Sequence, residues 1–88
     1  MNVHTVSYDL DAPGQLYPAI IGRLTALGAK RIQFSHWMLR SNMTAAELRD
    51  DLLRYIDSND RLLVVDVTNA PMAWHNLETQ IKTAFNLT

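Results

Sequence analysis

The sequence predicts a single α+β domain in which four short strands form one antiparallel sheet, followed by a C-terminal helix. Two observations lead to this prediction. Segments with strand character alternate with segments whose apolar residues recur at helical spacing, in the order strand, helix, two strands, helix, strand. The chain of 88 residues also has room for only one modest core. We therefore expect residues 1–88 to form one domain.

The first strand and the first helix are predicted within residues 3–28. Val3–Leu10 is rich in β-branched and aromatic residues and is long enough for a central strand. From Gln15 to Leu27, apolar residues recur at helical spacing. Pro18 is tolerated in a first turn, and Gly28 is placed to end the helix.

The next segment, Lys30–Arg40, returns to strand character. Four of its large apolar residues are Ile32, Phe34, Trp37 and Leu39. They share one face only if the chain folds back near Ser35 and His36, which predicts two short strands in a hairpin. A two-residue turn prefers Gly or Asn, and neither is present at Ser35 and His36, so one long bent strand is the alternative.

A second helix is predicted by a capping box, formed by Thr44 and Glu47. Its buried stripe is expected to comprise Leu48, Leu52 and Ile56. A polar turn at residues 57–60 then leads into the last strand. The run Leu62–Val67 has apolar residues on both faces, which is typical of a strand covered on both sides.

The tail is predicted to be helical. After Pro71, four large apolar residues are spaced three, four and four apart: Trp74, Leu77, Ile81 and Phe85. Such a stripe can dock on the body of the domain or on a second subunit.

The order of elements is that of the ferredoxin-like βαββαβ fold, in which both central helices pack on one face of the sheet. The other face is then bare. We place Leu62 and Val64 on this open face together with Val3 and Thr5. Because a monomer would expose that apolar surface to water, we expect a homodimer that packs through the open face.

Composition excludes several classes of protein. The chain has no Cys, so a disulfide framework and a thiolate metal site are excluded. The sequence has neither a membrane-spanning apolar run nor a signal peptide, so we expect a cytoplasmic protein that does not enter a membrane. With 8 Lys plus Arg against 9 Asp plus Glu, nucleic-acid binding would need a local basic patch.

Three short segments resemble a known family: Tyr8-Asp9, Arg31–Ser35 and Thr44–Leu52. They are similar to the small nuclease-like subunit of the CRISPR spacer-acquisition complex, and more closely to its shorter SinR-like relatives. The resemblance implies a ferredoxin-like homodimer that contacts DNA or RNA, either as a nuclease or in a structural role. It also implies a divalent metal ligand at Asp9.

The first candidate site is the end of the first strand. Asp9 is a candidate Mg²⁺ ligand, because this cation prefers carboxylate oxygens and keeps several waters. The alternative is that Asp9 stabilises the turn that follows it. His36 and Asp60 fall at the same edge, which makes His36 the best candidate general acid or base; the alternative is a solvated hairpin histidine. Asp66 lies at the far edge from Asp9.

The second candidate site is a basic patch formed by Lys30, Arg31 and Arg40. In the predicted hairpin, Arg31 and Arg40 stand directly opposite each other, which favours a phosphate or another anion between them. The alternative is a solvated rim.

Aromatic and histidine side chains offer weaker signals. Trp37 and Trp74 have the chemistry to stack on bases, but both fall on apolar stripes that are typical of core residues. His4, within the first strand, and His75, at the start of the tail helix, are expected to be structural or exposed.

Two functional hypotheses follow. The first is a homodimer that binds nucleic acid and cleaves phosphodiesters with Mg²⁺ held by Asp9. The second is a non-catalytic dimeric scaffold or regulatory module that binds a protein partner through its sheet edge or its C-terminal helix.

Overall fold

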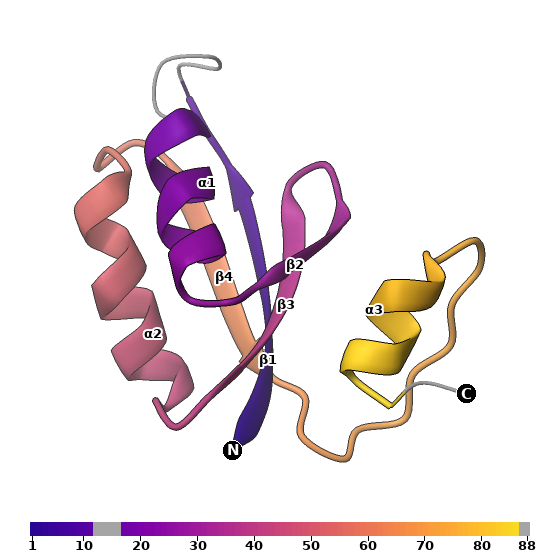
Figure 1. The fold of residues 1–88 in the computed structure, drawn as a ribbon. Helices are drawn as coiled ribbons and strands as arrows, with labels where there is room; N and C mark the ends of the chain where they lie inside the picture. The colour runs from indigo at the N-terminus through magenta and orange to yellow at the C-terminus, as the bar shows by residue number, and fades with distance from the viewer. Residues whose placement is uncertain (12–16, 87–88) are drawn as a thin grey trace.

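A computed structural model describes residues 1–11 and 17–86 (Figure 1). The predicted turn at residues 12–14 and the predicted helix start at Gln15 lie outside the described residues. The elements are β1 (Asn2–Asp9), α1 (Tyr17–Ala26), β2 (Lys30–Gln33), β3 (His36–Ser41), α2 (Ala45–Leu52), the 3-10 helix η1 (Leu53–Tyr55), β4 (Arg61–Asp66) and α3 (Thr79–Ala84). The described part of the chain is therefore α+β, as predicted.

The sheet has four antiparallel strands in the order β2-β3-β1-β4, with β1 in the centre as predicted. Helices α1 and α2 cover one face, which we call the helix face, and α3 lies on the opposite side, which we call the open face (Figure 1). This arrangement is consistent with the ferredoxin-like family of folds in general. No helix of the described residues is long and apolar enough to span a membrane.

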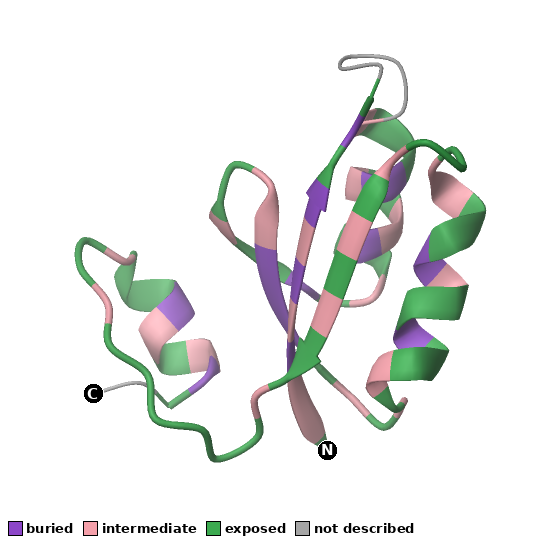
Figure 2. Ribbon diagram, turned by 180° about the vertical axis from the view of Figure 1, so that it is seen from behind, coloured by how far each residue is buried: buried purple, intermediate pink, exposed green. Residues whose placement is uncertain are grey.

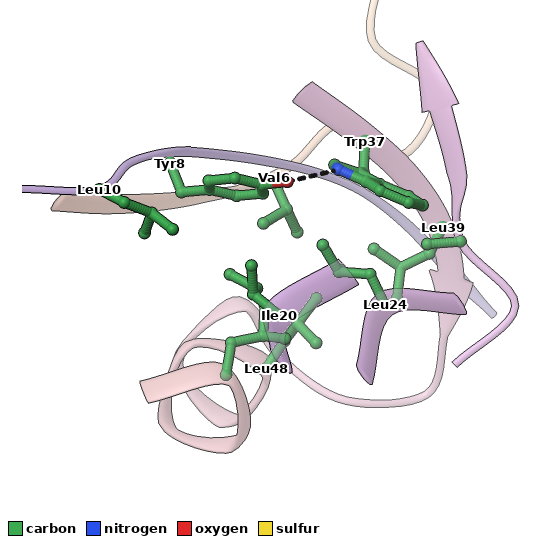
Figure 3. Close-up of a cluster of buried hydrophobic side chains, with 10 residues drawn as sticks. Val6, Tyr8, Leu10, Ile20, Leu24, Trp37, Leu39 and Leu48 are labelled. Carbon is green, nitrogen blue, oxygen red and sulfur yellow. Dashed lines mark hydrogen bonds between the residues drawn. The ribbon is translucent and has the colours of Figure 1, made fainter. Parts of the chain in front are cut away.

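The main core lies between the sheet and the two helices on its helix face (Figure 3). Its buried residues are Val6, Tyr8, Leu10, Ile20, Leu24, Ala29, Trp37, Leu39, Leu48 and Leu52. The indole Nε1 of Trp37 donates a 3.1 Å hydrogen bond to the Tyr8 hydroxyl, so this buried indole has a partner. The prediction that Trp37 is a core residue is confirmed.

Local signals in the sequence correctly predict the start of α2 and the end of α1. The Thr44 hydroxyl accepts from the Glu47 amide at 3.1 Å, and the Glu47 carboxylate accepts from the Thr44 amide at 2.8 Å, which completes the capping box. After α1, Gly28 adopts a φ of 80° and ends the helix. However, α2 ends at Leu52, so Ile56 lies beyond the helix for which it was predicted.

The hairpin is confirmed, but its predicted face is wrong. Trp37 and Leu39 belong to the main core, whereas Ile32 packs on the open face and Phe34 is 70% exposed. The register of β2 against β3 shifts between Arg31 and Gln33. Such an irregularity interrupts the alternation of side chains along the strand, which is why one face does not collect all four residues.

The predicted placement of Leu62 and Val64 is also wrong. They lie opposite Tyr8 and Val6 of β1 and pack against the main core on the helix face. Their neighbours on the open face, Leu63 and Val65, are 60% and 40% exposed. Strand β4 is therefore an edge strand with one exposed side, and the prediction that it is covered on both sides is wrong (Figure 2).

The tail helix begins later than predicted, because α3 covers only Thr79–Ala84. Asn76 has a φ of 59°, which interrupts a right-handed helix between Trp74 and Leu77. Trp74 and Leu77 consequently precede the helix. Within α3 and just after it, Ile81 and Phe85 pack with Met38, and partly with Val3 and Ile32, on the open face. The prediction of a bare open face is therefore wrong, since α3 covers part of it.

Candidate functional site

The carboxyl end of β1 carries the predicted metal ligand. Asp9 is exposed, is the last residue of the strand and lies opposite Arg61 of β4. A shallow hollow of about 230 Å³ at this position is lined by Ser7, Tyr8, Asp9, Arg61, Leu62 and Leu63. The structure thus places the Asp9 carboxylate beside a cationic side chain at an accessible edge of the sheet.

His36 lies at the same end of the sheet as Asp9, as predicted. It is paired with Ser7, which precedes Asp9 by two residues and lies on the same face of β1 as Asp9. Its Nδ1 donates a 2.9 Å hydrogen bond to Oε1 of Gln33, which leaves Nε2 as the acceptor of the ring. Burial lowers the pKa of His36, so the imidazole is mainly neutral at pH 7.

The acidic residues near this edge do not assemble into a metal cluster. Asp60 lies at the predicted edge, but its two oxygens accept 2.7 Å hydrogen bonds from the Asp11 and Asp57 amides and thereby hold the turn. Asp66 lies at the opposite end of β4, as predicted, and the Thr68 hydroxyl and amide hydrogen bonds lower its pKa. Within residues 1–11 and 17–86, no three His, Asp or Glu side chains are grouped to hold a metal ion.

The predicted basic patch is divided between the two faces. Arg31 is opposite Trp37, and its guanidinium lies 4.9 Å from the centroid of that ring. Arg40 is opposite Val3 of β1, so the prediction that it faces Arg31 is wrong. The reason is the register, which pairs β2 with the first residues of β3 only. Lys30 is opposite Met38 on the open face.

Arg40 has a structural role on the open face. Its Nε donates a 3.3 Å hydrogen bond to the carbonyl oxygen of Ala84, and its guanidinium lies 5.7 Å from the centroid of the Phe85 ring. A cation that donates to the last carbonyls of a helix also interacts favourably with the helix dipole. Arg40 therefore anchors the end of α3 on the sheet.

The open face contains a groove between the sheet and the C-terminal segment. It has a volume of about 450 Å³ and is lined by Thr5, Ile32, Gln33, His36, Met38, Met72, Ala73, Trp74, His75 and Leu77. The sheet supplies an apolar floor with Gln33 and His36 at its edge, and residues 72–77 supply the opposite wall. Every residue of this lining lacks a carboxylate, an ammonium or a guanidinium group. We call this feature the open-face groove.

A second hollow of about 480 Å³ lies nearby and shares Met72 with the open-face groove. Its other lining residues are Met1, Val3, Arg40, Val67, Thr68, Asn69, Ala70, Phe85 and Asn86. The C-terminal segment is thus anchored at Ile81 and Phe85, with a concave surface between residues 67–77 and the sheet.

The other aromatic and histidine candidates divide as follows. Trp74 is half-buried in the open-face groove, so its predicted core position is wrong. His75 is exposed, lines the same groove and precedes α3, so its predicted place at the helix start is wrong. His4 is fully buried, and its Nε2 donates a 2.9 Å hydrogen bond to the Met43 carbonyl. This structural role of His4 agrees with the prediction.

No family model matches the sequence, and no solved structure matches the chain significantly. The resemblance to the CRISPR-associated family and its SinR-like relatives stays a prediction.

Proposed function

We propose that this protein is a non-catalytic binding module of ferredoxin-like architecture that receives an extended apolar segment of a partner protein in the open-face groove. The strand order β2-β3-β1-β4, with two helices on one face, supports the ferredoxin-like assignment. The groove supports the binding function.

The observation that carries this proposal is the chemistry of the groove lining. Ligand sites are typically concave and mainly apolar, with a few polar groups that fix orientation. Ile32, Met38 and Leu77 supply apolar surface here, while Gln33 and His36 supply neutral polar groups at one edge. A peptide backbone presents neutral donors and acceptors of its own, so an uncharged segment fits this lining better than a phosphate or a carboxylate does.

Contacts elsewhere in the molecule favour binding over catalysis. The carboxylate of Asp60 holds a turn, Arg31 stacks on Trp37, and Arg40 anchors α3. Arg31 and Arg40 were candidates for anion binding, and Asp60 lies at the edge of the candidate metal site; each is engaged in a contact that stabilises the fold. The residues that line the groove are apolar or neutral.

The test is a comparison of three proteins used as bait in extracts of the source cells: wild type, Met72→Glu and the control Leu53→Glu. Met72 is 38% exposed and lines the groove, whereas Leu53 is 48% exposed in η1. We expect wild type and Leu53→Glu to retain the same partner protein. Met72→Glu is expected to retain at least about tenfold less of it, because the charge removes a central contact of the interface. Equal retention by all three baits would contradict the proposal.

A second candidate function is metal-dependent cleavage of phosphodiesters, which the exposed edge at Asp9 favours. Asp9 would supply one oxygen ligand to Mg²⁺, a cation that is often held by one or two carboxylates and keeps several waters. Arg61, directly opposite, would bind a phosphate oxygen, and His36 lies at the same end of the sheet. Because the Asp60 carboxylate at this edge is engaged in holding the turn, Asp9 would share the metal with the substrate or with a second subunit.

This candidate is tested by incubating labelled single- and double-stranded DNA and RNA with wild type, Asp9→Asn and Asp50→Asn in Mg²⁺ or Mn²⁺. Asp50 is a suitable control because it is exposed on α2, where its side chain is 63% accessible. Cleavage that is lost only in Asp9→Asn would support the metal role. No cleavage and no binding by wild type at low salt would remove this candidate and leave the binding module.

A further inference from the structure

The two edges of the sheet differ in how they are protected against pairing with another strand. Strand β2 has four residues, a register shift and two cations, Lys30 and Arg31. Short length, irregular pairing and charge are the features by which natural proteins block an edge. Strand β4 has six residues, pairs regularly with β1 and carries four consecutive apolar residues between Arg61 and Asp66. By these criteria β2 is a protected edge and β4 is an open one.

The backbone of β4 presents a regular set of groups at its free edge. The Val67 amide donates to the Val3 carbonyl at 2.8 Å, in the same register that pairs Thr5 with Val65. Antiparallel pairs alternate between those that exchange hydrogen bonds and those that do not. The odd-numbered residues of β4 therefore bond toward β1. The amides and carbonyls of Leu62, Val64 and Asp66 point toward the free edge.

The side chains of β4 add an apolar surface beside these backbone groups. Leu63 and Val65 stand on the open face and are 60% and 40% exposed. Leu62 and Val64, which alternate with them, are half-buried against the main core. Figure 2 shows this alternation along β4. An exposed edge with apolar side chains of this kind is a template for another strand.

We propose that β4 pairs with β4 of a second copy of this chain, antiparallel and about a twofold axis, so that the two sheets join into one continuous sheet. This surface is separate from the open-face groove, and the proposal goes beyond the binding function above. It also differs from the dimer predicted from the sequence, which packs face to face.

Symmetry and charge select one of the two registers that pair the most residues of β4, centred on Leu63 and on Val64. A twofold axis through the shared edge keeps the open faces of both sheets on the same side, and residues directly opposite must share a face. In the register that places Leu63 opposite its own copy, Asp60 lies opposite the partner's Asp66, and like charges in such positions repel. The register centred on Val64 avoids this repulsion.

The selected register also pairs the exposed apolar side chains. Leu63 lies opposite the partner's Val65, and Val65 lies opposite the partner's Leu63. In addition, Val64 and its copy exchange the backbone hydrogen bonds that point to the free edge. Four apolar side chains that water reaches in the monomer then form one cluster on the open face of the joined sheet, which contributes the hydrophobic driving force for association.

The test uses complementary charges at the two paired positions, with molar mass measured by light scattering or sedimentation over a wide range of concentrations. Wild type is expected to show twice the chain mass of 10.0 kDa. Leu63→Lys alone and Val65→Glu alone are each expected to weaken the dimer by at least about tenfold, because symmetry introduces each uncompensated charge twice. An equimolar mixture of the two variants is expected to restore it, since Lys at 63 then faces Glu at 65.

The control Leu53→Lys, at an exposed apolar residue away from β4, is expected to leave the dimer unchanged. Far-ultraviolet circular dichroism establishes that each variant is folded, and the two variants test the same pair independently. A monomeric wild type at every concentration would overturn the proposal. So would a dimer that both variants lose and that mixing does not restore, because face-to-face packing does not require Leu63 and Val65 to be opposite. Neither outcome bears on Met72 and the open-face groove.

Discussion

The two faces of the sheet are covered by helices that are held in different ways. On the helix face, α1 and α2 close a core of ten buried residues, and α2 begins with a complete capping box. On the open face, α3 has six residues, and its N-cap residue Glu78 makes no side-chain capping hydrogen bond. Among the described residues, the buried cluster here comprises Met38 of the sheet together with Ile81 and Phe85 of the α3 segment. The helix face therefore provides most of the stability, and the open face retains surface for binding.

Polar contacts follow the same division. On the helix face, Arg23 of α1 donates two hydrogen bonds, of 2.8 and 2.6 Å, to the carboxylate of Asp51 in α2. On the open face, the corresponding contact is the single 3.3 Å hydrogen bond from Arg40 to the Ala84 carbonyl. Since two-point contacts between Arg and a carboxylate are stronger and more directional, α1 and α2 are locked together more firmly than α3 is held on the sheet.

The largest effect is expected from a cavity on the helix face. Leu48→Ala removes a side chain that is fully buried beneath α2, and we expect the free energy of unfolding to fall by about 2–5 kcal/mol. Urea denaturation followed by circular dichroism measures this change. The matched control is Leu53→Ala, at a residue that is 48% exposed, with an expected change within about 0.5 kcal/mol. Similar losses for both variants would contradict the assignment of stability to the helix face.

A smaller effect on global stability is expected from the same kind of change on the open face. Ile81→Ala removes a buried contact of α3, and a helix of six residues is too short to persist without docking. We expect the amides of residues 79–84 to lose protection in hydrogen exchange, while those of β1 keep theirs and the free energy of unfolding falls by no more than about 2 kcal/mol. Thr83→Ala, at an exposed position of α3, is the control. Equal loss of protection in β1 would show that α3 is part of the cooperative core.

The smallest effect concerns the ion pair between α1 and α2, and it depends on pH. The hydrogen bond from Arg23, with a smaller contribution from its charge, lowers the pKa of Asp51 in the folded protein. The stabilisation is therefore present above the unfolded-state pKa of about 3.9 and is lost as the pH falls through the lower folded-state value. We expect the urea midpoint of Asp51→Asn to lie below that of wild type at pH 7, with a difference that shrinks below about pH 4.

The control for this prediction is Asp50→Asn, because Asp50 is 63% accessible and pairs with its neighbour Arg49. Its midpoint is expected to stay close to that of wild type at each pH, since exposed ion pairs contribute little. If the difference between Asp51→Asn and wild type were constant from neutral to acidic pH, the ion pair would not be the source of the stabilisation.

Part of the candidate site was predictable from the directions of the strands. Asp9 and His36 lie at the same end of the sheet, and Asp66 at the other, because antiparallel strands fix which ends meet. The open-face groove was not predictable in this way. Its lining joins Thr5 of β1 with Trp74 and Leu77, which the helical spacing assigned to a docked helix. Left-handed backbone at Asn76 excludes that helix, and spacing alone does not reveal it.

By itself, the sequence determined the features that depend on neighbouring residues: the central strand at β1, the capping box at Thr44, the helix end at Gly28 and the hairpin between β2 and β3. Only the tertiary structure decided which side chains face which side of the sheet. The physical reason is the two-residue period of a strand, since a shift of one residue in pairing moves every side chain to the opposite face. The same alternation places Val64 against the main core and leaves Leu63 and Val65 exposed on the open face.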